Sequence, residues 1–125
     1  NAARHHVSIE CLQGDLVAPF APPVDCIVAN PPYVPEGEWE TLSPVITRHE
    51  DPSALLAGPD GLDCIRRLIP EAVHCLRPGG MLALEIGETQ YDTVAALFRA
   101  HGFEDITCDR DLAGIKRIIS GIRVS

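Results

Sequence analysis

An uninterrupted apolar run that stops at two prolines is the feature that most constrains the fold of this chain. Cys26-Ile27-Val28-Ala29 is followed at once by Asn30-Pro31-Pro32-Tyr33. A short apolar run without alternation is typical of a strand buried on both faces, as in parallel sheets. Proline fixes φ and has no N–H to donate, so the strand has to end before Pro31. The sequence therefore predicts a buried parallel strand with Asn30 at its carboxyl end.

Strand and helix patterns alternate along the rest of the chain. In chain order, they predict strands over 7–11 and 26–29, a helix over 62–76, a strand over 81–86, a helix over 89–101, and strands over 103–109 and 116–123. The last two strands have no helix between them, which favours an antiparallel pair. This order predicts an α/β fold with a mostly parallel sheet and an antiparallel carboxyl-terminal edge. Residues 34–60 are predicted to form a long loop with a helical turn near Trp39.

Composition narrows the class of protein. The chain has 125 residues, 46% of them apolar, which is enough for one domain. Its net charge of −8 argues against non-specific binding to nucleic acid. The five cysteines form no C-x-x-C pair, and we expect reduced core thiols. Neither a leader peptide nor a membrane span is recognised, so the sequence predicts a cytoplasmic protein, and the start at Asn1 suggests chain upstream.

The residues after the apolar run offer hydrogen-bond acceptors. Open α/β sheets bind their ligands at the carboxyl ends of strands, which is where Asn30 is expected. The Asn30 side-chain oxygen and the Pro31 carbonyl could accept the two N–H groups of a planar NH2 group and aim its delocalised lone pair at an electrophilic methyl. The Tyr33 ring could pack on the flat face of that group. Methylation of an amide or of a base amine is therefore the chemistry that this motif favours, mostly by positioning.

With its neighbouring motifs, the chain resembles the HemK-type protein-glutamine N-methyltransferases, which modify a glutamine amide in translation release factors. The N-P-P-Y motif alone is shared with adenine and guanine amino-methyltransferases, so the other blocks carry the distinction. The matching blocks, in chain order, are Gly14-Asp15, 25–33, Glu50 with Ala54-Leu55, 58–63, 76–80, Leu84-Glu85-Ile86-Gly87 with Gln90, and Asp111-Leu112-Ala113-Gly114 with Arg117. One departure is Glu50-Asp51-Pro52, where the family usually has Glu-Pro before the Ala-Leu pair.

The resemblance implies a fold, a cofactor and a site. The fold would be the Rossmann-like class I methyltransferase fold, and the cofactor S-adenosyl-L-methionine, with no metal. Residues 1–125 would be the C-terminal portion of the catalytic domain, and the substrate a peptide chain release factor. The implied catalytic residues are Asn30, Pro31, Pro32 and Tyr33. The implied cofactor-binding residues are Asp15, Leu16 and Asn30, with Asp15 and Leu16 bordering the adenine.

Parts of the family pattern are absent from these 125 residues. The glycine-rich strand-to-helix turn, the acidic strand end that follows it and the amino-terminal helical domain have no counterpart. Family sheets run in the order third, second, first, fourth, fifth, seventh, sixth strand, so the strand over 26–29 would have an open edge. An open edge favours pairing with another chain. We expect a homodimer through that edge, re-pairing of the first strand, or a piece of a longer protein.

Several alternatives stay open at this level. The same acceptors suit an adenine or guanine amine, and a chain without the full cofactor cradle could be an inactive interaction module. Glu85 is either a satisfied carboxylate or a cofactor-side group, and Trp39 either covers the substrate or anchors its loop. Residues 60–63 most simply form a turn with a helix cap rather than a catalytic group. Asp111 and Arg117 are expected to hold the final hairpin.

Overall fold

The computed structural model describes residues 1–20, 22–41 and 57–125, apart from the side chains of 39–41. The elements, in chain order, are β1 (Val24–Ala29), the 3-10 helix η1 (Glu36–Thr41), α2 (Asp63–Cys75), β2 (Leu76–Glu85), α3 (Tyr91–Ala100), β3 (Phe103–Arg110) and β4 (Lys116–Arg123). Both predicted helices form with nearly the expected bounds, and η1 is the helical turn predicted near Trp39. Residues 42–56, with the Glu50-Asp51-Pro52 departure, lie outside the described residues.

The described strands form a mixed sheet in the order β1-β2-β4-β3. β1 and β2 are parallel because α2 carries the chain back between them, whereas β2–β4 and β3–β4 are antiparallel. The predicted antiparallel carboxyl-terminal edge is confirmed, and the order matches the fourth, fifth, seventh and sixth strands of the family sheet. The prediction of a mostly parallel sheet is wrong for the described part of the chain, where one pairing of the three is parallel.

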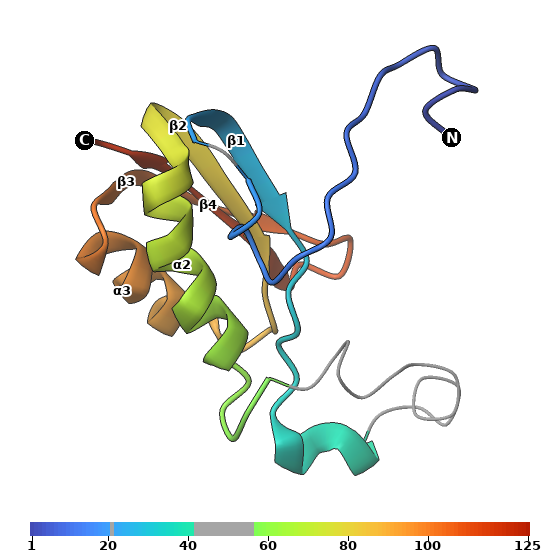
Figure 1. Cartoon of the computed structure of the whole chain (residues 1–125). Coiled ribbons are helices and arrows are strands. Elements are labelled where there is room, and N and C mark those ends of the chain that lie inside the picture. Colours follow the sequence, from blue (N-terminus) through green and yellow to red (C-terminus); the bar gives the residue numbers. More distant parts are fainter. Residues whose placement is uncertain (21, 42–56) are drawn as a thin grey trace.

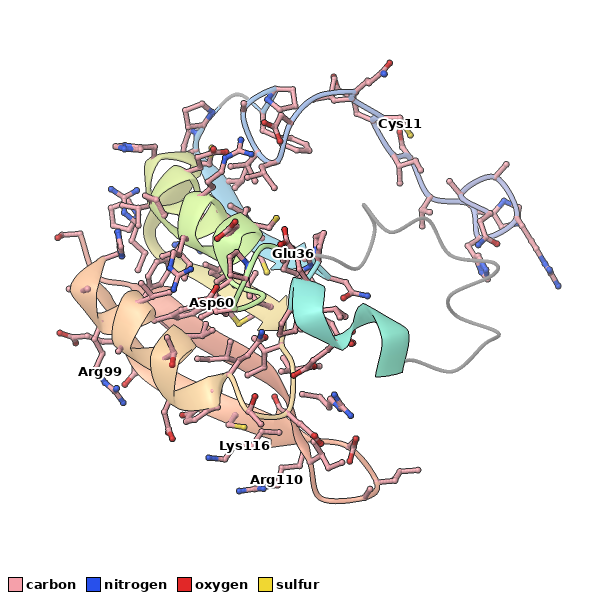
Figure 2. The ribbon with its side chains drawn as sticks, turned by 90° about the horizontal axis from the view of Figure 1, so that it is seen from below. Cys11, Glu36, Asp60, Arg99, Arg110 and Lys116 are labelled. Carbon is pink, nitrogen blue, oxygen red and sulfur yellow. The ribbon has the colours of Figure 1, made fainter. Side chains whose placement is uncertain are left out.

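The strand predicted over 7–11 does not form. Val7 and Ile9 are 56% and 67% exposed, and this stretch extends away from the sheet, with Cys11 standing clear of the helices (Figures 1 and 2). A strand needs a hydrogen-bonded neighbour, and no described strand lies beside these residues. The prediction of a strand over 7–11 is therefore wrong, and so is the alternative in which this strand re-pairs.

β1 is a strand of the sheet but is not buried on both faces as predicted. Cys26 is exposed and Val28 is 76% exposed, whereas Ile27 and Ala29 pack against the core. The reason is that α2 and α3 both cover the same face of the sheet (Figure 1). β1 also has β2 on one edge and no described strand on the other. Its open edge, expected from the family strand order, is therefore present in the described residues.

The core lies between the sheet and the two helices. α2 buries residues spaced three and four apart, and α3 buries Val94, Ala95 and Phe98. The ring of Phe98 lies 5.0 Å from that of Phe103. A Cβ at Gly121 in β4 would lie 2.8 Å from the Phe98 ring, so this glycine lets α3 approach the sheet closely.

The burial of the cysteines and the length of the helices bear on two of the predictions. All five cysteines are free, but Cys75 alone is buried, so the prediction of core thiols is wrong for the other four. Cys11 and Cys26 are exposed because the strand over 7–11 does not form and one face of β1 is uncovered. In the described ranges, no helix is long and apolar enough to cross a membrane.

Candidate functional site

The parallel pairing of β1 with β2 brings two chain reversals to one edge of the sheet. Ala29 pairs with Leu84, so Asn30 and Glu85 are the next residues on neighbouring strands. Residues 30–33, which we call the acceptor segment, leave β1 there, and residues 86–90 leave β2 there. Pro31 is buried, whereas Pro32 and Tyr33 are half-buried. The acceptor segment therefore starts at the carboxyl end of β1, as the sequence predicted.

An apolar groove of about 490 Å³ runs along the open edge of β1. Its walls come from residues 16–20, from β1 and from the face of α2 that carries Cys64 and Leu68. The groove brings together four of the predicted site residues, and these are Leu16, Asn30, Pro31 and Pro32. Neither Asp15 nor Tyr33 lines it. The predicted catalytic and cofactor residues are thus only partly gathered into one cavity.

The two predicted acceptors have no hydrogen-bond donor among the described residues. Asn30 is exposed, and in the part of the chain that the structure describes no hydrogen bond reaches its side chain or the carbonyl of Pro31. The two prolines remove N–H donors from this segment, so it presents acceptors to its surroundings. Asn30 and Pro31 could therefore accept both N–H groups of one amide.

Tyr33 is held at its hydroxyl group. The Tyr33 OH donates to Glu85 Oε1 at 3.3 Å, across the end of β2. Burial raises the pKa of Tyr33, the negative charge of Glu85 and this hydrogen bond raise it further, and Arg117 opposes them. The phenol is therefore a neutral donor at physiological pH. Glu85 accepts a hydrogen bond from the acceptor segment, which favours the satisfied carboxylate over a cofactor-side group.

Gln90 is a site residue whose role the sequence reasoning missed. Its side chain is 7% exposed and contacts both the acceptor segment and the turn after β2. Sequence reasoning noted Gln90 only as part of the Leu84–Gly87 block. Its place just before a helix, with apolar Val94 and Ala95 following, was the available sign that the side chain would point inward.

The residues predicted to border the adenine of the cofactor are held by fewer contacts than the acceptor segment. Asp15 forms an ion pair with Arg67 of α2 at 2.5 Å, with both side chains more than half exposed. Leu16 has a positive φ of 52°, which turns the chain so that the half-buried Leu16 lines the groove. The groove offers an apolar wall that fits a flat adenine ring. None of the described residues lining it is acidic, so it does not fit the ribose hydroxyls or the methionine amine of the cofactor.

The other motifs form local structure, as expected. Asp60 Oδ1 accepts the N–H of Leu62 at 3.1 Å and binds Arg66, which lowers the pKa of Asp60, so residues 60–63 form the predicted turn. The predicted helix cap is wrong, because Leu62 is the residue before α2 and no side chain caps the helix there. Asp111 accepts the N–H groups of the β3–β4 turn and bonds Arg117 at 3.1 Å, so the final hairpin is held as predicted.

The remaining expectations concern a metal site and Trp39. Among the described residues there is no group of three or more His, Cys, Asp or Glu side chains that could hold a metal ion. The side chain of Trp39 lies outside what the structure describes.

Comparisons with known proteins relate this arrangement to methyltransferases. No family model matches the chain. The release factor glutamine methyltransferase of Geobacter sulfurreducens is 39% identical over 122 residues, which are 97% of this chain and 43% of that protein. Its counterpart in Moorella thermoacetica is 50% identical over 95 residues, 75% of this chain and 33% of that protein. The chain thus spans less than half the length of these curated relatives.

A solved structure agrees with these relatives. The E. cuniculi Mtq2–Trm112 complex, described as responsible for methylation of the eRF1 translation termination factor, matches with a TM-score of 0.61 and 26% identity. The match covers 90% of this chain and 60% of that one. The chain is therefore a homologue of the release factor glutamine methyltransferases of the HemK family, with an α/β fold and a mixed sheet that match part of a methyltransferase.

Proposed function

We propose that this chain is part of an S-adenosylmethionine-dependent N-methyltransferase that acts on a glutamine side-chain amide. The observation that carries the proposal is a pair of acceptors, the Asn30 side chain and the Pro31 carbonyl, at the carboxyl end of β1 beside the groove, to which none of the described residues donates a hydrogen bond. The names of the relatives favour a peptide chain release factor as the protein substrate. A cytoplasmic location is part of this proposal.

In this proposal, residues 30–33 position the amide. The Asn30 side-chain oxygen and the Pro31 carbonyl accept its two N–H groups, and Pro32 restricts the backbone so that the Pro31 carbonyl keeps its direction. The Tyr33 ring lies against the face of the amide and excludes water. When bound, the cofactor would supply the electrophilic methyl group and leave as S-adenosylhomocysteine, and the displaced amide proton would pass to water. The contribution of these residues is therefore a near-attack geometry rather than proton transfer.

Residues 1–125 would hold one part of the cofactor, and residues from elsewhere would hold the rest. Leu16 and Asn30 border the groove, and Asp15 lies next to them, so these residues suit the adenine end and the part nearest the amide. The ribose and the methionine part need residues from elsewhere. We therefore propose that residues 1–125 are the C-terminal portion of a Rossmann-like class I methyltransferase domain.

The open edge of β1 needs a partner strand in this proposal. We propose that chain outside residues 1–125 supplies that strand and completes the cofactor cradle. The alternative for the 125-residue chain alone is a homodimer through the same edge. Sedimentation at increasing concentration distinguishes the two arrangements. A homodimer that the short chain forms and a longer chain does not form supports a partner strand from outside residues 1–125.

The proposal is tested by cofactor binding. S-Adenosylhomocysteine is titrated calorimetrically into the 125-residue chain and into a chain extended upstream in its gene by about 150 residues, roughly one further domain. Binding by the extended chain, with weak or no binding by the short chain, is expected. Binding by neither would contradict the cofactor assignment and leave residues 30–33 as a structural turn.

The substrate class is tested by methyl transfer in the extended chain. Labelled methyl groups are expected on a release-factor peptide that contains glutamine, and not on the same peptide with glutamate at that position. Asn30→Ala is expected to lower the rate about 100-fold, because the amide loses one of its two anchors. Arg99→Ala, on the exposed side of α3 (Figure 2), is the control and should leave the rate unchanged. Transfer to an adenine-containing oligonucleotide instead would favour the base-amine alternative.

A further inference from the structure

Gln90 is the one polar or charged side chain that is buried in the described part of the chain. Buried polar groups are retained where their hydrogen bonds are satisfied, and each bond then restricts its partner strongly. Gln90 immediately precedes α3, at the edge of the sheet where the acceptor segment begins. Its partners are therefore relevant to the geometry of the site.

The orientation of the Gln90 amide follows from its partners. Its Oε1 accepts the N–H of Gly87 at 2.8 Å, and an NH2 group could not accept that bond. Its Nε2 therefore faces the acceptor segment and donates to the carbonyl oxygen of Tyr33 at 2.8 Å. The carbonyls of Asp60 and Gly61 lie 3.5 Å from the same nitrogen. One side chain thus joins the turns that follow β1 and β2 with the turn that precedes α2.

The glycines around Gln90 allow this close approach. A Cβ at Gly61, where φ is +77°, would lie 2.2 Å from the Tyr33 carbonyl oxygen and 2.8 Å from Gln90 Nε2. A Cβ at Gly87 would lie 3.0 Å from Gln90 Oε1. The three turns can therefore meet at Gln90 only because two of them carry no side chain at the point of contact.

The acceptor segment has little freedom once its ends are held. Ala29 is fixed at one end by its pairing with β2, and the Tyr33 carbonyl is fixed at the other end by Gln90. Between these two points, the rings of Pro31 and Pro32 restrict φ. The direction of the Pro31 carbonyl is thereby determined from both sides.

We infer that Gln90 is a positioning residue for methyl transfer: by holding the Tyr33 carbonyl, it sets the direction in which the acceptor segment receives the substrate amide. The inference rests on the function proposed above and adds a residue that touches neither substrate nor cofactor in it. The reacting amide is held by Asn30 and Pro31, and Gln90 acts on them through the backbone of the acceptor segment.

Gln90→Glu tests this with an almost unchanged side-chain shape. The introduced carboxyl group still accepts the N–H of Gly87, but when ionised it presents an oxygen to the Tyr33 carbonyl in place of a donor. At pH 8 the rate constant kcat in the extended chain is expected to fall about 10- to 100-fold, with a smaller change in KM for the cofactor. Burial raises the pKa of such a carboxyl group, and its protonated form can donate again. The deficit relative to the unsubstituted protein should therefore shrink as the pH is lowered.

Val94→Ala in α3 is the control for stability alone. Val94 is fully buried, and its hydrogen bond from N–H to the Gln90 carbonyl at 3.0 Å is made by the backbone, which alanine keeps, so this substitution lowers the melting temperature but should leave kcat unchanged in the folded protein. A loss of activity in Val94→Ala as large as that in Gln90→Glu, at matched melting temperature, would overturn the positioning role. So would a Gln90→Leu protein with unchanged kcat, since leucine cannot donate to the Tyr33 carbonyl at any pH.

A second readout does not depend on activity. In the same protein, the carbon resonance of the Tyr33 carbonyl and the hydrogen exchange of the Gly87 amide are measured by NMR. Gln90→Glu is expected to shift the Tyr33 resonance while keeping Gly87 protected, and Gln90→Leu to shift Tyr33 and expose Gly87. If the unsubstituted protein transfers no methyl group, the proposed function fails, and the Tyr33 resonance still decides whether Gln90 holds the segment. An unshifted Tyr33 resonance in both variants overturns the inference.

Discussion

The acceptor segment and the amino-terminal segment, residues 7–16, approach the same groove but are held very differently. In the acceptor segment, Tyr33 is bonded at its carbonyl by Gln90 and at its hydroxyl by Glu85. In the amino-terminal segment, the one side-chain bond in the described part of the chain joins Asp15 to Arg67. The segment before Asp15 runs through solvent (Figure 1).

The difference shows how the site is divided along the chain. The groups proposed to hold the substrate amide have their supporting contacts within residues 30–90. The groups proposed to hold the cofactor have few supporting contacts. Among the described residues, the strand pattern over 7–11 has no neighbouring strand, and the apolar groove lies beside an open strand edge. In the proposed function, this chain therefore supplies the residues that hold the substrate amide, and only some of those that hold the cofactor.

Gly61→Ala should disturb the acceptor segment most. The alanine Cβ would meet the Tyr33 carbonyl oxygen at 2.2 Å and would also have to adopt a positive φ. We expect the free energy of unfolding to fall by about 3 kcal/mol, since left-handed strain and overpacking both oppose folding. Urea denaturation followed by circular dichroism measures this.

Gly102→Ala is the matched control for that substitution. Gly102 has φ of +81° and no atom within 4 Å of the added Cβ, so strain acts there without a clash. A loss of about 1–2 kcal/mol is expected. Equal losses in the two variants would mean that the turn before α2 does not press on Tyr33.

Tyr33→Phe should have a smaller effect. It removes the 3.3 Å bond to Glu85, which is partly open to solvent, and we expect a loss of about 1 kcal/mol at pH 8. The pKa of Tyr33 is raised in the folded protein, so its contribution is complete below about pH 10 and is lost as the pH rises further. Stability measured from pH 8 to 11 should therefore decline less steeply in Tyr33→Phe.

Tyr91→Phe is the control for Tyr33→Phe. Tyr91 is also half-buried, and its ring lies 4.3 Å from Lys116 Nζ, a contact that phenylalanine keeps in part. An alkaline decline that is reduced equally in both variants would show that Glu85 does not hold Tyr33.

Sequence reasoning predicted the elements that depend on local pattern and a neighbour inside the chain. The helices α2 and α3 and the β3–β4 hairpin have apolar spacing and turn residues of their own, and each packs against described residues. The strand over 7–11 and the burial of β1 failed because both depend on a neighbour that periodicity does not reveal. A periodic apolar pattern indicates which face of an element would be buried, but it does not indicate whether another element covers that face.

Sequence reasoning predicted the site only in part, as it did the fold. Asn30 and Pro31 followed from the end of an apolar run, because strand ends and prolines are visible in sequence. Gln90 could not be assigned a partner, since its bond to Tyr33 spans 57 residues and depends on the parallel pairing of β1 with β2. The ion pair between Asp15 and Arg67 spans 52 residues and was equally hidden.

Arg67→Met should have the smallest effect, and it tests how firmly the amino-terminal segment is held. The Arg67 and Asp15 side chains are 56% and 68% exposed, so water and salt screen the pair, and we expect a loss of about 0–1 kcal/mol. Arg66→Met, which removes the equally short pair with Asp60, is the control. Hydrogen exchange should become faster around residues 14–16 in Arg67→Met only, because no other described side chain holds Asp15. A loss well above 1 kcal/mol, or unchanged exchange at 14–16, would mean that the amino-terminal segment is anchored as firmly as the acceptor segment.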